Sequence, residues 1–516
     1  MRSKKALANI IASLILQFVT VVCGFIVPRL IIRTFGSNIN GLTTSITSFL
    51  GYITLFEAGV GGVVRASLYK PLSNKDISSI SGILKATEKF FKSLSYVFIG
   101  YLFVIALYFS FFANKGYDIF FTFSLVLIIG LSTFVQYYFG LTYQVLLYAD
   151  QKQYISSSLQ IITLIINTFL VAVLIKLGAG IHMVKFGSSL IYIVRFVSIF
   201  LYVKRKYKLI KDCPENKDAI RNRWDGLGHH IAYFLHRNTD IVVLTLFTNF
   251  EEVSVYYVYF MVVSGIEKLV TSFSTGLEAA FGNVIAKEEN EILDRNFRIY
   301  ELISSSLTTI LFTSTAMLII PFITLYTKGV TDANYIRPLF AYILVMAEAV
   351  YCIRIPYHSV VLAAGHFRQT RNGAFIEASL NVILSLILVN YLGIIGVAIG
   401  TLSAMLFRTI QYAIYLSRNI LNRKISEFTK RCFINIFAVL LIIFVVNSLK
   451  VTKISSYTEW VLYAICVTII SIVIVMLINI VFYRTDIIKL FRIIKSLLIP
   501  NNKKTETKAY YKYLGG

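Results

Sequence analysis

The chain has 516 residues, of which 57% are hydrophobic and only 15% are charged, and its mean hydropathy is +0.72. This composition excludes an ordinary water-soluble globular protein, because too few polar side chains remain to cover a folded surface. The net charge of +24 would suit a nucleic-acid-binding protein, but the positive charges lie between apolar runs, as they do in membrane proteins. We therefore expect a membrane protein that does not bind nucleic acid.

The apolar runs in chain order predict an all-α polytopic membrane protein. They are long and do not alternate, which favours transmembrane helices over a β-barrel. The first run continues past Ile32, too far for the core of a cleaved signal peptide, so we interpret it as a retained span. About fourteen spans are expected, near residues 8–32, 42–66, 93–113, 118–147, 155–176, 183–203, 228–249, 253–285, 299–327, 337–364, 373–391, 394–417, 431–449 and 458–483.

The lysines and arginines predict the orientation of these spans. With the N-terminus in the cytoplasm, most of the 50 basic residues fall in inside segments, and only a few, such as Lys176 and Lys185, fall in outside segments. Both termini are therefore expected in the cytoplasm. The basic tail after Tyr483 has the pattern of an amphipathic helix on the anionic leaflet.

A weak internal repeat divides the spans into two halves. Ala149 and Ala364 lie at matching positions in two similar segments, and Gly178 and Gly393 end the apolar runs that follow; both pairs are 215 residues apart. Two pseudo-symmetric six-helix lobes are expected, with a cavity between them and two additional C-terminal helices. The expected domains are an N-lobe (1–222), a C-lobe (223–425), spans 13 and 14 (426–483) and a basic cytoplasmic tail (484–516).

The sequence shows no signature of an enzyme or of a cofactor or metal site. It has no Walker loop and no HExxH motif, and its acidic residues form no metal-ligand pattern. The five cysteines also lack metal spacing, which makes a zinc site or a disulfide framework improbable: they are Cys23, Cys213, Cys352, Cys432 and Cys466. We expect a carrier without catalytic residues.

Ionisable residues inside the apolar spans are the candidate functional residues. Each costs about 2.5–3.5 kcal/mol to insert, so such residues usually face protein or water. Spans 1 and 2 carry Arg29, Glu57 and Arg65, and span 10 carries Arg354. Span 7 has a polar stripe at helical spacing and span 8 repeats it; the two stripes comprise His229, Tyr233, His236, Arg237, Asp240, Glu267, Thr271, Ser274, Thr275 and Glu278, with Lys268 beside the second.

Two interpretations of these residues remain open. They can pair with one another for packing, as Arg237 and Asp240 could on one helix face. They can instead line a hydrated cavity between the lobes, which adjacent polar stripes favour because such stripes do not face lipid.

Three segments carry a family resemblance. PRLIIRTFG closes span 1, NGLTTSITSFLGYITLFEAGVGGVVRASLYKPL follows it, and RNTDIVVL lies in span 7. They resemble the polysaccharide flippases of the multidrug/oligosaccharidyl-lipid/polysaccharide exporter superfamily. The resemblance implies movement of a polyprenyl-diphosphate-linked oligosaccharide across the bacterial cytoplasmic membrane by alternating access, for cell-surface polysaccharide such as exopolysaccharide, capsule or O-antigen. It also implies that Arg29, Arg65 and Lys268 meet the diphosphate, with Arg237 nearby.

The same resemblance implies how transport is driven and which partners take part. Without a nucleotide site, the drive comes from an H⁺ or Na⁺ gradient or from downstream consumption of the substrate; Glu57, His236, Asp240, Glu267 and Glu278 are the candidate coupling residues. Expected partners are membrane lipids, the lipid-linked oligosaccharide, a polysaccharide polymerase and glycosyltransferases. The alternatives are an ion-coupled drug exporter, which would carry an excess of acidic cavity residues, and a non-transporting scaffold of a glycan assembly complex.

Overall fold

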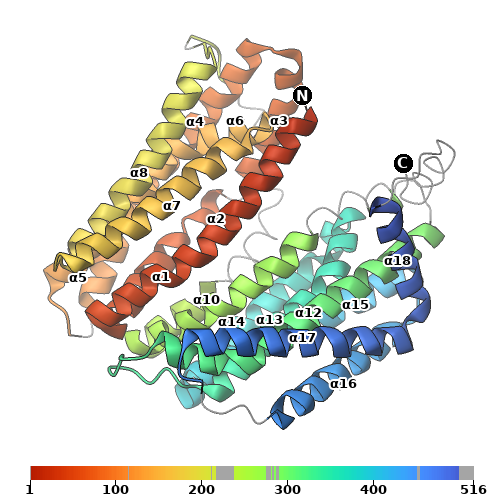
Figure 1. Ribbon diagram of the computed structural model, residues 1–516. Helices are drawn as coiled ribbons and strands as arrows, with labels where there is room; N and C mark the ends of the chain where they lie inside the picture. The colour runs from red at the N-terminus through yellow and green to blue at the C-terminus, as the bar shows by residue number, and fades with distance from the viewer. Residues whose placement is uncertain are drawn as a thin grey trace. The chain divides into compact units, whose positions relative to one another are not determined.

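All regular elements in the described part of the computed structural model are helices (Figure 1). The structure describes residues 2–57, 59–113, 116–210, 212–216, 238–274, 281, 284–285, 290–449 and 454–498. The helices are α1 (Arg2–Gly51), α2 (Thr54–Glu57), α3 (Val60–Asn74), α4 (Ile77–Phe111), α5 (Ile119–Val135), η1 (Gln136–Gly140), α6 (Leu141–Ala149), α7 (Gln153–Lys176), α8 (Ile181–Lys206), α10 (Phe250–Ser274), α12 (Asn290–Tyr326), α13 (Pro338–Ala363), α14 (Phe367–Leu392), α15 (Ile394–Asn419), α16 (Ser426–Ser448), α17 (Tyr457–Phe482) and α18 (Arg484–Leu498).

Among the described residues, twelve helices are long and apolar enough to cross a membrane, which confirms a multi-pass membrane protein. The first of them, Leu7–Glu57, holds the first expected span and most of the second, because α1 is interrupted at Gly36, where φ is 88° and ψ is 168°. The expected seventh span contributes only the short apolar helix Asn238–Phe247 to the described residues. The expectation of about fourteen spans agrees with this arrangement.

Two expected spans are not continuous α-helices. The second span, expected over 42–66, is interrupted by a turn after Gly51, and α3 begins again after Gly59, which has a left-handed φ of 88° that suits glycine. The fourth span consists of α5, the π-helical turn η1 and α6. A π turn rotates the following side chains and is frequent at functional sites. Both interruptions place polar side chains that are described below.

In the compact unit formed by Met1–Tyr257 and Gly329–Ala333, segments predicted to lie on the same side of the membrane contact one another. Lys85 Nζ donates to the Cys213 carbonyl at 3.0 Å, and both residues belong to predicted inside segments. At the predicted outside, Asn38 Nδ2 donates to Glu251 Oε1 at 2.7 Å. Asp332 caps the second half of α1, since it accepts from the N–H and the hydroxyl of Ser37 at 2.6 and 2.7 Å. The order of the helices therefore agrees with the predicted alternation, and which side is the cytoplasm stays a prediction.

The chain divides into two compact units. The first contains Met1–Tyr257 and Gly329–Ala333, and the second contains Val258–Lys328 and Asn334–Gly516. Helices of similar length recur in the same order in each, with α4, α7 and α8 matched by α12, α14 and α15. The repeated Gly178 and Gly393 both have positive φ and both precede a new helix. The lobe boundary predicted after residue 222 stays a prediction.

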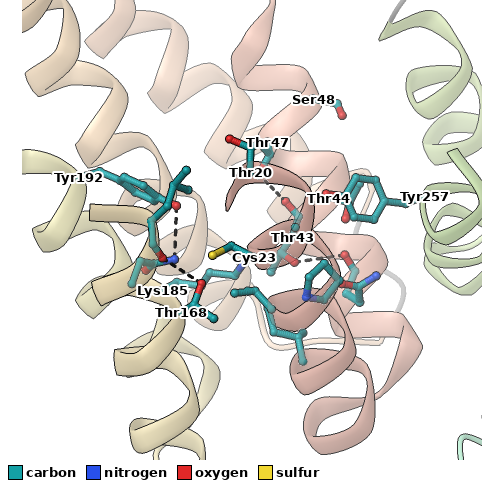
Figure 2. A pocket seen from close by; sticks show the side chains of 17 residues that line it. Thr20, Cys23, Thr43, Thr44, Thr47, Ser48, Thr168, Lys185, Tyr192 and Tyr257 are labelled. Atoms are coloured by element: carbon teal, nitrogen blue, oxygen red, sulfur yellow. Dashed lines mark hydrogen bonds between the residues drawn. The ribbon is translucent and has the colours of Figure 1, made fainter. Parts of the chain in front are cut away.

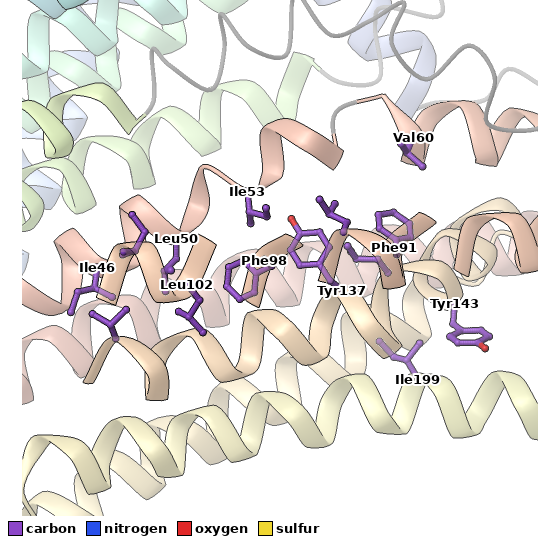
Figure 3. Close-up of a cluster of buried hydrophobic side chains, with 14 of the residues drawn as sticks. Ile46, Leu50, Ile53, Val60, Phe91, Phe98, Leu102, Tyr137, Tyr143 and Ile199 are labelled. Atoms are coloured by element: carbon purple, nitrogen blue, oxygen red, sulfur yellow. The ribbon is translucent and has the colours of Figure 1, made fainter. Parts of the chain in front are cut away.

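Each unit has its own apolar core. In the first unit, side chains from α1, α3, α4 and η1 interlock around Phe98 and Tyr137 (Figure 3). In the second unit, one cluster surrounds Phe297 and Tyr357, and another joins α12 to α16 and α17. Many large apolar side chains on the outer faces stay exposed, as expected for helices that face lipid.

Candidate functional site

The structure places four of the predicted site residues in the first unit. Arg29 is half-buried on α1. Arg65 is exposed on α3, where its Nε donates to the Gly61 carbonyl of its own helix at 3.1 Å. Glu57 ends α2, and Asp240 lies in the short helix Asn238–Phe247 and is only 3% exposed. These four residues lie on separate elements.

The remaining predicted residues divide between the second unit and segments outside the described residues. Glu267 on α10 is 2% exposed, and its neighbour Lys268 is exposed. Arg354 is buried on α13. The predictions for Arg237, His236 and Glu278 fall outside the described residues, as do those for His229 and Tyr233 in the span 7 stripe. Their roles stay predictions.

Tyrosine hydroxyl groups are the observed partners of both predicted coupling carboxylates in the first unit. Tyr137, positioned by η1, donates to Glu57 Oε2 at 3.1 Å. Tyr256 on α10 donates to Asp240 Oδ2 at 2.8 Å. Sequence analysis missed these partners, because a tyrosine in an apolar run has the same pattern as any other buried aromatic residue. Each hydroxyl is a neutral donor that satisfies one oxygen of its carboxylate.

Arg354 belongs to an ion cluster that sequence analysis did not find. Its Nη1 lies 2.6 Å from Glu377 Oε1 on α14, and Arg408 Nε on α15 lies 3.4 Å from the other carboxylate oxygen. Arg408 also donates to the Thr370 carbonyl and to the Tyr412 hydroxyl. One carboxylate thus serves two buried guanidinium groups, and the cluster keeps one positive charge in excess.

A second cluster in this unit surrounds Glu301 on α12. Arg423 Nη2 lies 3.1 Å from Glu301 Oε1, Arg431 Nε lies 3.4 Å from Oε2, and the Tyr357 hydroxyl also donates to this carboxylate. Arg423 lies between α15 and α16, outside the spans. Burial acts to lower its pKa, but the charge of Glu301 and its hydrogen bond outweigh this and raise the pKa above the ordinary value. The cluster ties the start of α16 to α12.

The first unit also contains an open cavity of about 300 Å³, lined by apolar side chains and by many hydroxyl groups, which we call the polar cavity. Figure 2 shows Lys185, Thr168 and Tyr192 on one wall, and Thr43, Thr44 and Tyr257 on the opposite wall. Of the seventeen lining residues, Lys185 alone carries a full charge, and none is Asp or Glu. Lys185, which the sequence places among the outside basic residues, lies near the start of α8, and its side of the membrane stays a prediction.

Helical spacing builds this cavity. Asn40, Thr43, Thr44, Thr47 and Ser48 recur at i, i+3, i+4, i+7 and i+8, which puts five short polar side chains on one face of the second half of α1. This stripe was the sequence signal that could have revealed the cavity. It was missed because threonine and serine inside a span more often bond to their own helix than line a site.

A second cavity in the first unit, of about 580 Å³, is mostly apolar. It lies where α1 ends, and its lining comes from α1, α2, α4 and the short helix Asn238–Phe247, with residues Phe49, Tyr52, Ile53, Leu55, Phe56, Val97, Gly100, Tyr101 and Val242. Tyr52 forms a side-chain hydrogen bond with Thr239, next to Asp240 in the sequence. The apolar cavity therefore lies close to Asp240, a predicted coupling residue.

The comparisons with known proteins identify the fold. No protein-family model and no curated protein matches the sequence. Among solved structures, the lipid II flippase MurJ in an inward closed conformation matches with a TM-score of 0.68 and 16% identity, over 93% of this chain and 100% of that chain. The chain has the fold of the multidrug/oligosaccharidyl-lipid/polysaccharide exporter (MOP) superfamily. A multidrug resistance MATE transporter of the MOP superfamily in an inward-facing conformation matches with a TM-score of 0.59 and 15% identity, over 80% of this chain and 96% of that chain.

The MOP-type matches differ in how much of this chain they cover. An outward-facing MATE structure covers 83% of this chain and MurJ covers 93%. The segment from Ser426 onward contains α16, α17 and α18. In this segment α17 packs on α12, where Ser314 donates to Ser471 at 3.2 Å, Asn479 donates to Ser306 at 2.8 Å and Trp460 donates to the Leu318 carbonyl at 3.2 Å. These two C-terminal helices are an integral part of the second unit.

Among the described residues, no group of three His, Cys, Asp or Glu side chains is arranged to hold a metal ion. The polar groups of this MOP-type fold are instead single carboxylates with tyrosine partners, arginine-rich clusters around one carboxylate, and one lysine in a hydroxyl-lined cavity. Such groups can bind anions or exchange protons.

Proposed function

We propose that this protein moves polyprenyl-diphosphate-linked oligosaccharide repeat units across the bacterial cytoplasmic membrane by alternating access, for cell-surface polysaccharide synthesis. The observation that carries the proposal is the match to MurJ, a lipid II flippase, over the whole of that chain and 93% of this one. Lipid II is a lipid-linked substrate, and a diphosphate sugar head group cannot cross hydrocarbon unaided. Nothing is broken chemically in such a step, so the protein acts as a carrier.

The excess of basic residues supports an anionic substrate. Four of the basic residues predicted to bind the substrate lie in the described part of the chain: Arg29, Arg65, Lys268 and Arg354. Arginine forms bidentate contacts with phosphate. Arg354 is paired with Glu377, which neutralises part of its charge. The resemblance makes Arg29, Arg65 and Lys268, with Arg237, the candidates for diphosphate contacts.

The apolar cavity supports a lipid-linked substrate over a fully soluble one. Its lining from Phe49 to Val242 offers a polyprenyl chain apolar contact beside Tyr52. The head group would meet the cations while the chain stays in hydrocarbon, so the carrier need not extract the lipid from the membrane.

A drug exporter of the same superfamily is the second candidate, favoured by the fold match to the MATE structures. Exporters of cationic drugs need acidic groups in their cavities, as an attractive counter-charge. The described polar cavity carries Lys185 and no carboxylate, which argues against this candidate.

The test in cells is deletion of the gene followed by location of the lipid-linked oligosaccharide. The proposal expects it to accumulate on the cytoplasmic leaflet, out of reach of a membrane-impermeant sugar oxidant, and expects surface glycan to be lost. A non-transporting scaffold gives a different result, since variants with neutralised Arg29 and Arg65 would then restore normal surface glycan. Sensitivity to cationic dyes without any change in glycan would favour the drug exporter.

A further inference from the structure

Lys185 holds a positive charge in a place where the protein supplies no negative one. Within the described part of the chain, its ammonium group forms no hydrogen bond and no ion pair, and it reaches into the polar cavity between α1, α7, α8 and the start of α10 (Figure 2). Lys185 is half-buried, and a charge that is partly removed from bulk water is costly unless it is paired. The other titratable groups that line the cavity are Cys23, Tyr192 and Tyr257, which are all neutral at pH 7 in their ordinary state.

The hydroxyl groups of the lining fall into two sets. Thr43, Thr47 and Thr168 donate to the carbonyls of Asn40, Thr43 and Leu164 at 3.1, 2.7 and 2.9 Å, so their hydrogens are already used by the backbone of their own helices. Such side chains offer a ligand only oxygen lone pairs.

The second set keeps its donors. Within the described residues, the hydroxyls of Thr20, Thr44 and Ser48 form no hydrogen bond. The Tyr192 oxygen accepts from Asn167 Nδ2 at 3.3 Å, which leaves its own hydrogen available. Lys185 adds three N–H donors. One full positive charge, several mobile donors and no carboxylate are the features that a small anion requires and that a metal cation does not tolerate.

We propose that this cavity is a binding site for a small monovalent inorganic anion, of which chloride is the probe, and that Lys185 supplies its counter-charge. The volume of about 300 Å³ accommodates such an ion together with several waters, at about 30 Å³ for each water. The site lies wholly within the first unit and does not depend on the identity of the transported substrate. The proposal also excludes Na⁺ from this cavity, whereas the sequence led us to expect H⁺ or Na⁺ as the coupling ion.

The test uses the purified full-length protein and replaces sodium gluconate by sodium chloride at constant ionic strength and pH 7, with the melting temperature as readout. An anion that binds only the folded state raises the melting temperature along a saturating curve. The wild type should show this rise, and Lys185→Met should weaken the apparent chloride affinity by about 10- to 100-fold. Lys176→Met is the matched control: it removes an equivalent charge from the exposed end of α7 and should keep the wild-type response.

Lys185→Arg keeps the experiment decisive if Lys185→Met does not fold, since it retains the cation and should retain a chloride response. The proposal is overturned if the wild type shows no difference between chloride and gluconate, or if Lys185→Met responds as the wild type does. It is also overturned if Lys185→Met changes only the pH dependence of melting, because Lys185 would then be a proton carrier. The assay contains no lipid-linked substrate, so its result is independent of the proposed transport function.

Discussion

Arg354 on α13 and Glu377 on α14 form a buried ion pair with 2.6 Å between Nη1 and Oε1. The same carboxylate lies 3.4 Å from Arg408 on α15, so it holds three helices of the second unit together. Arg354 is a candidate substrate-binding residue from the sequence, and the ion pair with Glu377 gives it a structural role as well.

The pair predicts an order of stabilities. Glu377→Gln leaves two buried guanidinium groups without a counter-charge, whereas Arg354→Gln leaves Glu377 paired with Arg408; removing one partner of a buried pair costs about 3–5 kcal/mol. We expect the melting temperature to fall for both variants and to fall further for Glu377→Gln. If Arg354→Gln melts like the wild type and still abolishes transport, the substrate role is the correct one.

Close packing at Gly41 gives a second prediction. A methyl group at Gly41 on α1 would collide with the backbone carbonyl of Phe250 at the start of α10, whereas one at Gly62 on α3 meets no atom within 4 Å. Overpacking of this kind costs about 1–3 kcal/mol or more when backbone must move. Gly41→Ala should therefore lower the melting temperature and the folded yield, and Gly62→Ala should not. Equal behaviour of the two variants would show that the α1–α10 contact yields easily.

The sequence was sufficient for the spans, their order and the repeat, because long apolar runs and the positions of lysine and arginine follow directly from bilayer physics. The interruption of the second span at Gly59, between α2 and α3, was not predicted. The tightness of Gly41 could not be predicted, since a glycine in a helix does not indicate which backbone will lie against it.

The site was harder to predict, because its groups depend on pairs that are distant in sequence. Glu377 and Arg354 are 23 residues apart, on different helices, and no local pattern joins them. The cavity position of Lys185 could not be predicted, because this residue stands four residues after the start of α8, where a terminal lysine and a cavity lysine have the same sequence context. Asp240 was found from the polar stripe, whereas its partner Tyr256 was not.

Asp240 provides the third prediction, on coupling. Its Oδ2 accepts from Tyr256, and Asp240→Asn keeps the size of the side chain while removing its titration. If Asp240 couples protons to transport, reconstituted transport by this variant should lose its dependence on a pH gradient while the substrate still binds. Tyr256→Phe is the matched control and should keep gradient dependence. An Asp240→Asn variant that is fully gradient-dependent, or that misfolds, would reject the coupling role.

The carboxyl group of Asp150, which lies between α6 and α7, provides a pH prediction. Burial acts to raise its pKa, but hydrogen bonds from Lys152 at 2.6 Å and from Tyr207, together with Lys5 at 3.3 Å, outweigh this and lower the pKa below the ordinary value of 3.8. A lowered folded-state pKa stabilises the fold above the unfolded-state value and ceases to do so as the pH falls through the folded-state value.

We therefore expect Asp150→Asn to melt below the wild type from neutral pH down to about 5, and the two curves to converge below about pH 4. Melting temperatures measured across this range provide the check. Asp212→Asn, which changes an exposed carboxyl group, should follow the wild type throughout. A constant difference between Asp150→Asn and the wild type at every pH would mean that packing, and not the charge, is what the substitution removes.

The most direct measurement of the central proposal is translocation of a fluorescent polyprenyl-diphosphate-linked oligosaccharide in proteoliposomes, read as the fraction of label that an impermeant quencher reaches over time. The proposal predicts protein-dependent translocation that Arg29→Ala reduces by about 10- to 100-fold, since it removes a charge-assisted contact of about 1.5–3 kcal/mol. Arg33→Ala, one turn further along α1, should translocate at the wild-type rate. Equal rates in protein-containing and empty liposomes, under an imposed pH or sodium gradient of either direction, would contradict the proposed function.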